Sequence, residues 1–276
     1  MRLDELFRLL DIAEEDRAKC AGLISGAENS TGAAEAKAAL TSRLGSYSQD
    51  PLDVAIQDPM AWLTAFLQLT PTIVNWHRRL GVTPEITGDT LADVGRNIAI
   101  HRRSHGEFGL ETWDWLIPHY TGMMFALGRL NYMLHPTKET VDGVMAPGDW
   151  VPSIHIPESG PLSPQSVDES LEQAQAFFST YFPDKGVNVA VCVSWLLDPY
   201  LIEHLSSDTN IASFARRFAL LGQPQDDATA ALFFLFRTRD LRRLHTLPRD
   251  SSLRRLVLDR ATTGDPWQIR SGYVRL

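Results

Sequence analysis

The sequence predicts an α+β fold, with a helical N-terminal domain over residues 1–125 and a mixed β-sheet domain flanked by helices over residues 126–276. Two observations lead to this prediction. Up to about residue 125, apolar residues recur at helical spacing, as in the first helix at Leu3, Leu6 and Leu10. Beyond that point the expected order is β-β-α-β-α-β-α-β, which implies at least one parallel crossover.

Composition places the chain among ordinary globular proteins. Its 276 residues suffice for one large domain or two small ones, and 44% of them are hydrophobic. The net charge of −8 argues against a general nucleic-acid binder. Cys20 and Cys192 lie too far apart to predict a disulfide framework or a metal site. No signal peptide and no membrane-spanning run is evident, so we expect a soluble, cytoplasmic protein without a metal.

Helix start and stop signals organise the N-terminal half. Asp58 and Pro59 open a long helix that Gly81 ends, and Pro71 is expected to kink or split it. Residues 25–48 are small and polar, which predicts a loose connection around a short Ala-rich helix. Two further helices are expected, one from about residue 87 through LADVGRNIAIHRRSHG and one in GLETWDWLIPHYTGMM.

The C-terminal half contains short apolar runs bounded by turn residues. The predicted strands are FALGRLNYML, WVPSIHIPES, VNVAVCVSWLL, ATAALFFLFR and WQIRSGYVRL. SPQSVDESLEQAQAFFSTYFP reads as an amphipathic helix entered through serine caps. The other predicted helices are PYLIEHL, NIASFARRFALLG with Asn210 as a cap, LRRLHTL and SSLRRLVLDRA.

Four segments carry a resemblance: GRLNYML, SIHIPESGPLSPQSVDESLEQAQAFF, VCVSWLLDPYLIEHL and SSDTNIASFARRF. They resemble bacterial N-acyltransferases in which a helical domain precedes a GNAT-like domain. Relatives in that family attach fatty acyl chains to the amino sugar of lipoglycopeptide antibiotics. The resemblance implies acyl transfer from acyl-CoA or acetyl-CoA, or another acyl thioester, to a small-molecule amine in natural-product biosynthesis. An acyl carrier protein is a further partner that it suggests.

The turn at residues 155–166 is the expected coenzyme site. Free amides at a helix N-terminus suit a diphosphate, and the GNAT fold holds coenzyme A here. The usual GNAT glycine signature is absent and Pro161 lacks an amide hydrogen, so fewer or different contacts are expected. Without the resemblance, serines before a helix are read as plain caps. The residues assigned to the coenzyme are Ile156, Gly160, Leu162, Ser163, Ser166, Ser194 and Asn210.

His155 is the candidate for proton transfer. It ends a predicted strand, with Ile154 and Ile156 on the opposite face, and a histidine titrates in the range needed to accept an amine proton. A lone strand histidine is also a common structural residue. The weaker rivals are His101, His105 and His119. No Glu follows His101, so the pair four residues apart does not predict a zinc hydrolase.

The general acid stays open in the sequence. Many GNAT enzymes use an Asn for the pantetheine arm and a nearby Tyr to protonate the leaving thiolate. Asn210 fits the first role, or is a plain helix cap, whereas Phe214 cannot donate a proton. Tyr200 and Ser194 are the candidate substitutes.

Two clusters remain. Trp113 and Trp115 either pack the domain interface or line the acyl or acceptor cleft. The arginine-rich stretch 237–260 is a solvated face, or contacts the coenzyme 3′-phosphate or an acidic carrier protein. The competing functions are a catalytically inactive GNAT-like module that binds a thioester or partner, and an unrelated small α+β enzyme.

Overall fold

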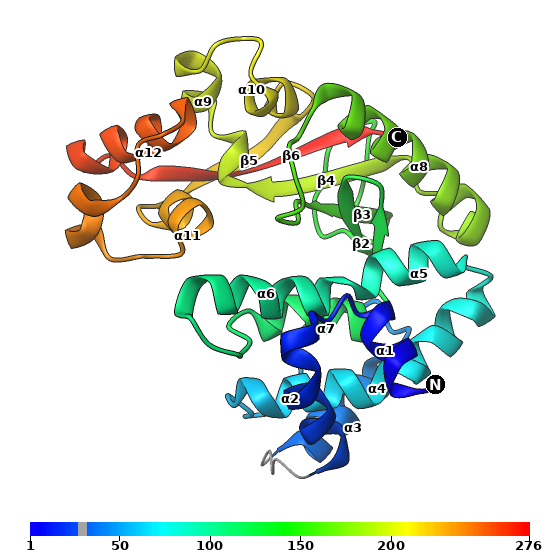
Figure 1. Cartoon of the computed structure of the whole chain (residues 1–276). Coiled ribbons are helices and arrows are strands. Elements are labelled where there is room, and N and C mark those ends of the chain that lie inside the picture. The colour runs from blue at the N-terminus through cyan, green and yellow to red at the C-terminus, as the bar shows by residue number, and fades with distance from the viewer. Residues whose placement is uncertain (27–31) are drawn as a thin grey trace.

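The computed structural model describes residues 1–26 and 32–276, so part of the predicted loose connection, residues 27–31, lies outside the described residues. Helices form the first part of the chain and a sheet with flanking helices forms the second, which confirms the predicted fold class (Figure 1). The N-terminal helices are α1 Leu3–Leu9, α2 Glu14–Ser25, α3 Ala33–Arg43, α4 Pro59–Leu80, α5 Pro84–Leu91, α6 Asp93–His105 and α7 Trp113–Tyr120.

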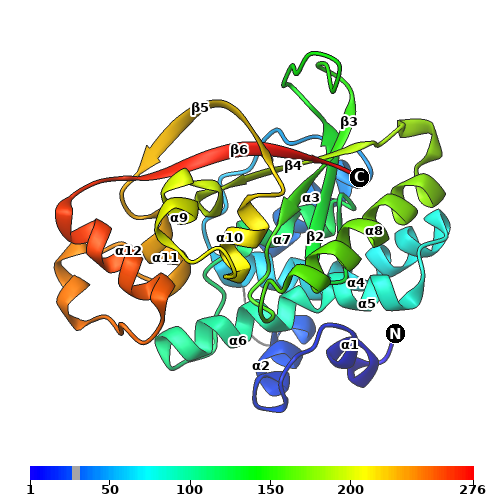
Figure 2. The same ribbon diagram turned by 90° about the horizontal axis from the view of Figure 1, so that it is seen from above.

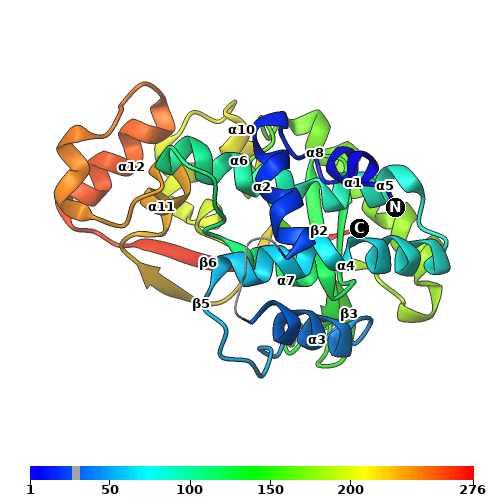
Figure 3. The ribbon, with the colours of Figure 1, turned by 60° about the horizontal axis from the view of Figure 1, so that its bottom comes forward.

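Helix α4 is the centre of the helical domain, with α3 and α7 packed beside it (Figure 3). Asp58 caps it by accepting a 2.9 Å hydrogen bond from the Met60 amide, and Gly81 ends it with a φ of 81°. The helix continues through Pro71, so the predicted split is not observed. Buried side chains before and after the proline hold the helix in place across the missing hydrogen bond.

The expected third helix is two helices. Thr83 accepts a hydrogen bond from the Ile86 amide and starts α5 at Pro84, three residues before the predicted start. A bend at Ala92 separates α5 from α6. Inside α6, Gly95 donates its amide to the Leu10 carbonyl at 2.9 Å, and a Cβ there would collide with that backbone. The absence of a side chain at Gly95 therefore lets α6 lie directly against the α1–α2 turn.

The sheet has six strands in the order β1-β2-β3-β4-β6-β5. Figure 2 shows β2 to β6 from above. Their pairings are antiparallel except for β3 with β4, which is parallel and confirms the expected crossover. The bounds are β1 Met124–Leu127, β2 Leu130–Pro136, β3 Trp150–His155, β4 Val189–Ser194, β5 Ala219–Asp227 and β6 Trp267–Arg275. The first predicted strand is thus a hairpin, which turns at Gly128 with a φ of 68°.

Two predicted elements have the wrong type. The apolar run at 228–237 is a helix, α11 Ala230–Phe236, and the segment assigned to a helix at 216–222 lies partly in β5. A short apolar run fits a buried strand or one face of a short helix equally well. Strand β5 is a largely exposed edge strand containing Pro224, so it lacks the apolar signature of a buried strand.

The remaining helices follow the prediction closely. They are α8 Pro164–Tyr181, α9 Pro199–His204, α10 Asn210–Ala215 and α12 Ser252–Thr263, with short 3₁₀ turns at Pro183–Lys185, Trp195–Leu197 and Leu241–Thr246. The predicted helix LRRLHTL is the last of these 3₁₀ turns. Asn210 is the first residue of α10 and not its cap, because the Thr209 hydroxyl accepts from the Ala212 amide. No described helix is long and apolar enough to cross a membrane.

The two parts of the chain meet at the β1–β2 hairpin. Phe125 packs against His77 of α4 at 5.4 Å between ring centroids and against Phe177 of α8 at 4.8 Å. The Ala126 amide donates to the Thr90 hydroxyl at 2.9 Å. The hairpin is therefore anchored both on α8 and on the helical domain.

Ser170 of α8 is buried beside the turn of the β1–β2 hairpin. Its Oγ accepts from the Leu130 amide at 3.2 Å, donates to the Leu127 carbonyl, and lies 3.1 Å from the Tyr132 hydroxyl. We expect Ser170→Ala to lower the free energy of unfolding by about 1–3 kcal/mol, because it leaves a buried amide unpaired. Urea unfolding measures it. The exposed Ser179→Ala on the same helix is the control, and an equal loss in both variants would contradict the prediction.

Candidate functional site

His155 lies at the end of β3, on the sheet face that the helical domain covers. Asn131 is its partner across β2 and β3, and the Trp115 ring meets the imidazole edge-on with 4.9 Å between centroids. The Nε2 atom is buried and has no hydrogen-bond partner. Burial lowers the pKa of His155 to about 4, with His119 and His135 contributing further. The ring is therefore neutral at pH 7 and has the electron pair that a proton acceptor needs.

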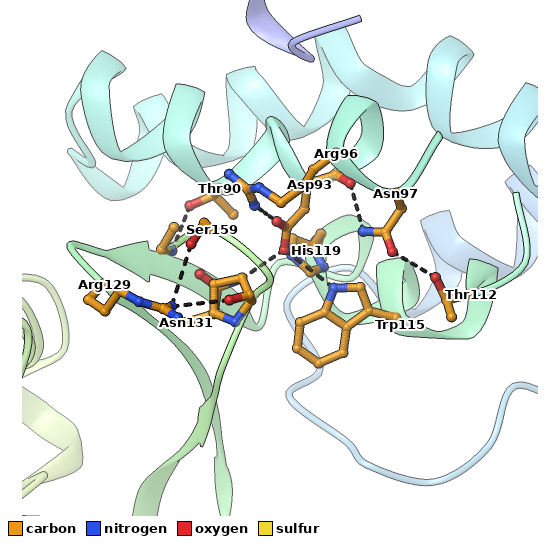
Figure 4. A network of polar contacts seen from close by, with 12 residues as sticks. Thr90, Asp93, Arg96, Asn97, Thr112, Trp115, His119, Arg129, Asn131 and Ser159 are labelled. Atoms are coloured by element: carbon orange, nitrogen blue, oxygen red, sulfur yellow. Dashed lines mark hydrogen bonds and ion pairs between the residues drawn. The ribbon is translucent and has the colours of Figure 1, made fainter. Parts of the chain in front are cut away.

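One buried carboxylate, Asp93, contacts both Trp115 and Asn131, the neighbours of His155, and Figure 4 shows this carboxylate with its partners. Asp93, at the start of α6, is 1% exposed and accepts hydrogen bonds from three side chains through Oδ2. The donors are Asn131 Nδ2 at 2.8 Å, His119 Nε2 at 3.0 Å and Trp115 Nε1 at 3.3 Å. Arg96 pairs with the other oxygen. The contact set joins the helical domain to strand β2 next to His155.

Arg129 shapes the loop that follows β3. From the β1–β2 turn, its guanidinium donates to the carbonyls of Pro157 at 3.1 Å, Gly160 at 2.7 Å and Pro161 at 3.0 Å. Because these carbonyls accept from Arg129, they do not accept from the amides of the same loop, which stay available to other acceptors. Within the described chain the amides of Gly160 and Leu162 have no protein acceptor. This arrangement provides a concentration of donors ahead of the α8 N-terminus that suits an anion.

The predicted serines have separate roles in this loop. Ser163 is the N-cap of α8 and accepts from the Ser166 amide at 3.2 Å. The Ser163 hydroxyl in turn donates to the Ser166 hydroxyl at 2.8 Å. The Ser166 amide is thus already paired with the Ser163 hydroxyl. The backbone amides of Gly160 and Leu162 remain available to an anion.

An ion-pair bridge crosses from this loop to both neighbouring parts of the molecule. Glu158 pairs with Arg103 of α6 and, at 2.5 Å, with Arg237 after α11. Arg237 has a φ of 52°, a left-handed conformation that is uncommon for a residue with a side chain. The bridge is partly exposed, so its contribution to stability is small.

Strands β3 and β4 are joined by a single ladder pair in the described residues, Ser153 with Val191. Their carboxyl ends beyond this pair are therefore not paired with each other. The open ends carry His155 on one strand and Ser194 on the other. Ser194 Oγ accepts from the Leu196 amide at 3.1 Å and starts a 3₁₀ turn. Backbone groups that are left unpaired along a strand can bind an extended, amide-containing chain.

Several predicted residues lie away from His155. Trp113 stacks on Trp62 at 4.9 Å with an interplanar angle of 2°, in the core of the helical domain. Phe214 is fully buried in the sheet-domain core. Tyr200 lies under the Arg260 guanidinium, 4.0 Å from its ring centroid. Asn210 is half-buried at the start of α10.

The His101 and His105 rings lie against each other, tilted by 32°, with 4.4 Å between their centroids. His101 Nδ1 lies 3.1 Å from the Glu107 carbonyl, and His105 lies 3.6 Å from Glu111. Across residues 1–26 and 32–276 no group of three or more His, Cys, Asp or Glu side chains is arranged to hold a metal ion.

Sequence reasoning missed Asp93, Arg129 and Asn131. Asp93 falls inside the helix predicted from about residue 87, where a single acid is usually a solvated residue, so no pattern in the sequence indicated it. Arg129 stands in a tight turn where a cation is ordinary. Only the approach of α6 to β2 brings Asp93 and Asn131 together.

Comparison with known proteins now identifies the chain. The N-acyltransferase N-terminal domain family matches residues 1–122, and the GNAT-like C-terminal domain family matches residues 124–274. The chain belongs to the N-acyltransferases with a GNAT-like C-terminal domain. The predicted enzyme class is confirmed. A comparison with curated protein sequences gave no match.

Solved structures of acyltransferases are similar over nearly the whole chain. One, in complex with decanoyl-CoA, has a TM-score of 0.84 and 31% identity, and covers 99% of this chain and 86% of its own. A second, with CoA and 10C-teicoplanin, has a TM-score of 0.85 and 29% identity, with 99% and 87% covered. The third is a tryptophan-to-alanine variant of orf11* with octanoyl-CoA, at 0.84 and 30%, with 99% and 87% covered.

The buried histidines of this N-acyltransferase make its free energy of unfolding depend on pH. Burial lowers the pKa of His119 to about 3 and that of His77 to about 4. The Asp93 carboxylate favours a charged His119 ring, but Arg96 already pairs with it, so burial prevails. Each native pKa lies below the unfolded value of about 6.5, so the stabilisation is complete above pH 6.5 and declines as pH falls toward 4.

We therefore expect the free energy of unfolding to fall between pH 7 and 4.5, by on the order of 2 kcal/mol for each buried histidine. His119→Gln keeps a donor for Asp93 and removes one titrating group, so its stability should change less over this range. Urea unfolding at the two pH values measures both proteins. An equal pH dependence would show that His119 is not a source of the acid sensitivity.

Proposed function

We propose that this enzyme transfers an acyl group from acyl-CoA to the amine of a small-molecule natural product, with His155 as the proton acceptor. The observation that carries the proposal is the position of His155, a neutral ring without a hydrogen-bond partner for Nε2, at the opening of β3 and β4 and against the helical domain. The family assignment supplies the reaction class.

The coenzyme lies, in this proposal, along the open ends of β3 and β4, with its diphosphate on the amides of Gly160 and Leu162. We propose Ile156, Ser163, Ser166, Ser194 and Asn210 as the further coenzyme contacts. Amides of β3 polarise the thioester carbonyl. Trp115 lines the acceptor side, and Trp113 supports it from the helical core.

The chemical step forms a C–N bond and breaks a C–S bond. The acceptor nitrogen attacks the thioester carbonyl carbon, and His155 takes the proton from that nitrogen, directly or through water. The carbonyl re-forms as the coenzyme thiolate leaves. The thiolate then takes up a proton to give free coenzyme A, and the product is an amide.

The relatives suggest which substrates to test. Their structures contain octanoyl-CoA, decanoyl-CoA and teicoplanin, so we infer a medium-chain acyl donor and a glycopeptide amine as acceptor. An acyl carrier protein is the alternative donor.

The decisive experiment incubates the purified chain with C2 to C12 acyl-CoAs and a non-acylated teicoplanin-type glycopeptide, and follows products by mass spectrometry. The proposal expects an acylated acceptor with one preferred chain length. Acyl-CoA binding without any product would instead support a binding module, and product only from acyl carrier protein would replace the donor.

His155→Ala should lower kcat by roughly 100-fold or more while the Kd for acyl-CoA changes little, because the variant removes the proton acceptor and leaves the loop amides intact. Stopped assays and calorimetry measure the two quantities. The exposed His245→Ala is the control. Turnover equal to that of the parent would remove His155 from the mechanism.

Arg129→Met should weaken acyl-CoA binding by about 10-fold or more, because the loop carbonyls lose their donor and become free to compete for the amides. Calorimetric titration with CoA measures the change, and Arg8→Met on the exposed side of α1 is the matched loss of charge. Unchanged affinity in Arg129→Met would place the diphosphate elsewhere.

A further inference from the structure

We propose that Asp93 is a positioning residue of this active site: it fixes Trp115 and Asn131 on two sides of His155 and so holds the imidazole in its reactive orientation. The inference rests on the proposed function for its kinetic readout. Asp93 belongs to the helical domain and accepts hydrogen bonds from Trp115 and Asn131 (Figure 4), the two residues that neighbour His155.

The charge of Asp93 is matched by donors from three elements. Trp115 and His119 come from α7, Asn131 comes from β2, and Arg96 belongs to α6 itself. A carboxylate buried to this degree is stable only when its oxygens are paired and hydrogen-bonded. The four partners therefore keep Asp93 ionised, and Asp93 keeps the four partners in one geometry.

Two of these contacts reach His155. The Trp115 indole, held through Nε1, presents its ring at 68° to the imidazole plane. Asn131, held through Nδ2, stands opposite His155 in the β2–β3 register. Because Nε2 of His155 has no hydrogen bond, its ring is oriented by packing, and the packing surface is set by Asp93. A small shift of a reacting group is enough to lower the rate markedly.

A purely structural carboxylate would behave differently, and the chain offers one for comparison. Asp16 in α2 is also 1% exposed and also pairs with an arginine, Arg102 of α6. It contacts neither Trp115 nor the sheet domain in the described structure. The two acids thus share burial and ion pairing and differ in their relation to His155.

The test compares Asp93→Asn with Asp16→Asn. Replacing the Asp93 carboxylate by an amide removes the charge and leaves one acceptor oxygen for donors on both sides, so an NH₂ group must face either Arg96 or the Trp115, His119 and Asn131 donors, and the set loses its geometry. We expect kcat to fall roughly 10- to 100-fold in Asp93→Asn with the KM for acyl-CoA unchanged, and kcat to stay near the parent value in Asp16→Asn. Unchanged kcat in a folded Asp93→Asn, or an equal loss in both variants, overturns the proposal.

Trp115→Phe keeps an aromatic ring against His155 and loses only the donor to Asp93, so it decides the question if Asp93→Asn does not fold. It should lower kcat by several-fold, whereas Trp62→Phe, which loses a hydrogen bond to the Ile56 carbonyl in the helical core, should not. No difference between the two tryptophan variants overturns the proposal.

A readout independent of turnover separates this proposal from the proposed function. NMR titration of the His155 ring protons reports its environment in parent and variants. A shifted and broadened His155 signal in Asp93→Asn, but not in Asp16→Asn, supports the positioning role even if no acyl-CoA proves to be a substrate. An unchanged signal contradicts it. Absence of acyl transfer by the parent enzyme counts against the function alone.

Discussion

The ionised Asp93 carboxylate is the constraint on which the arrangement of the two domains around His155 depends. A charge removed from water to this extent has a large desolvation cost, and hydrogen bonds from α6, α7 and β2 offset it. Strand β2 contributes Asn131 to this set, so separation of the domains would leave the carboxylate partly unpaired. The same contacts that hold the helical domain on the sheet therefore also fix the neighbours of His155, the proposed proton acceptor.

Near the contact between the two domains, side chains with no proposed part in the reaction hold the loop after β3 and the β1–β2 hairpin in place. Arg129 donates to three carbonyls of the proposed coenzyme loop, which leaves amides free for an anion. Ser170 fixes the hairpin that carries Arg129. The neutral state of His155 likewise follows from burial rather than from a hydrogen-bonded partner. The candidate site is thus preorganised by hydrogen bonds to backbone carbonyls and amides and by the burial of His155.

The errors of the sequence prediction have a common physical origin. ATAALFFLFR was assigned to a strand and is helix α11, and the edge strand β5 was assigned in part to a helix. The secondary structure of both segments depends on which neighbouring element packs against them. An apolar run of this length satisfies a sheet or a helix face equally, and an exposed edge strand carries little hydrophobic signal.

The sequence by itself determined the order of the main elements, the caps at Asp58 and Ser163, and the place of His155 at the end of a strand before a helix. This information lies in local backbone preferences and in the period of the hydrophobic residues. The four segments that resemble N-acyltransferases with a GNAT-like domain indicated the family. Only the tertiary structure decided which residues surround His155. Asp93 and Asn131 lie 38 positions apart, and their contact follows from the docking of α6 on β2, which no local pattern records. Trp113 and Trp115 look equivalent in sequence, yet the helix turns one into the core and the other toward the imidazole, because they are only two residues apart.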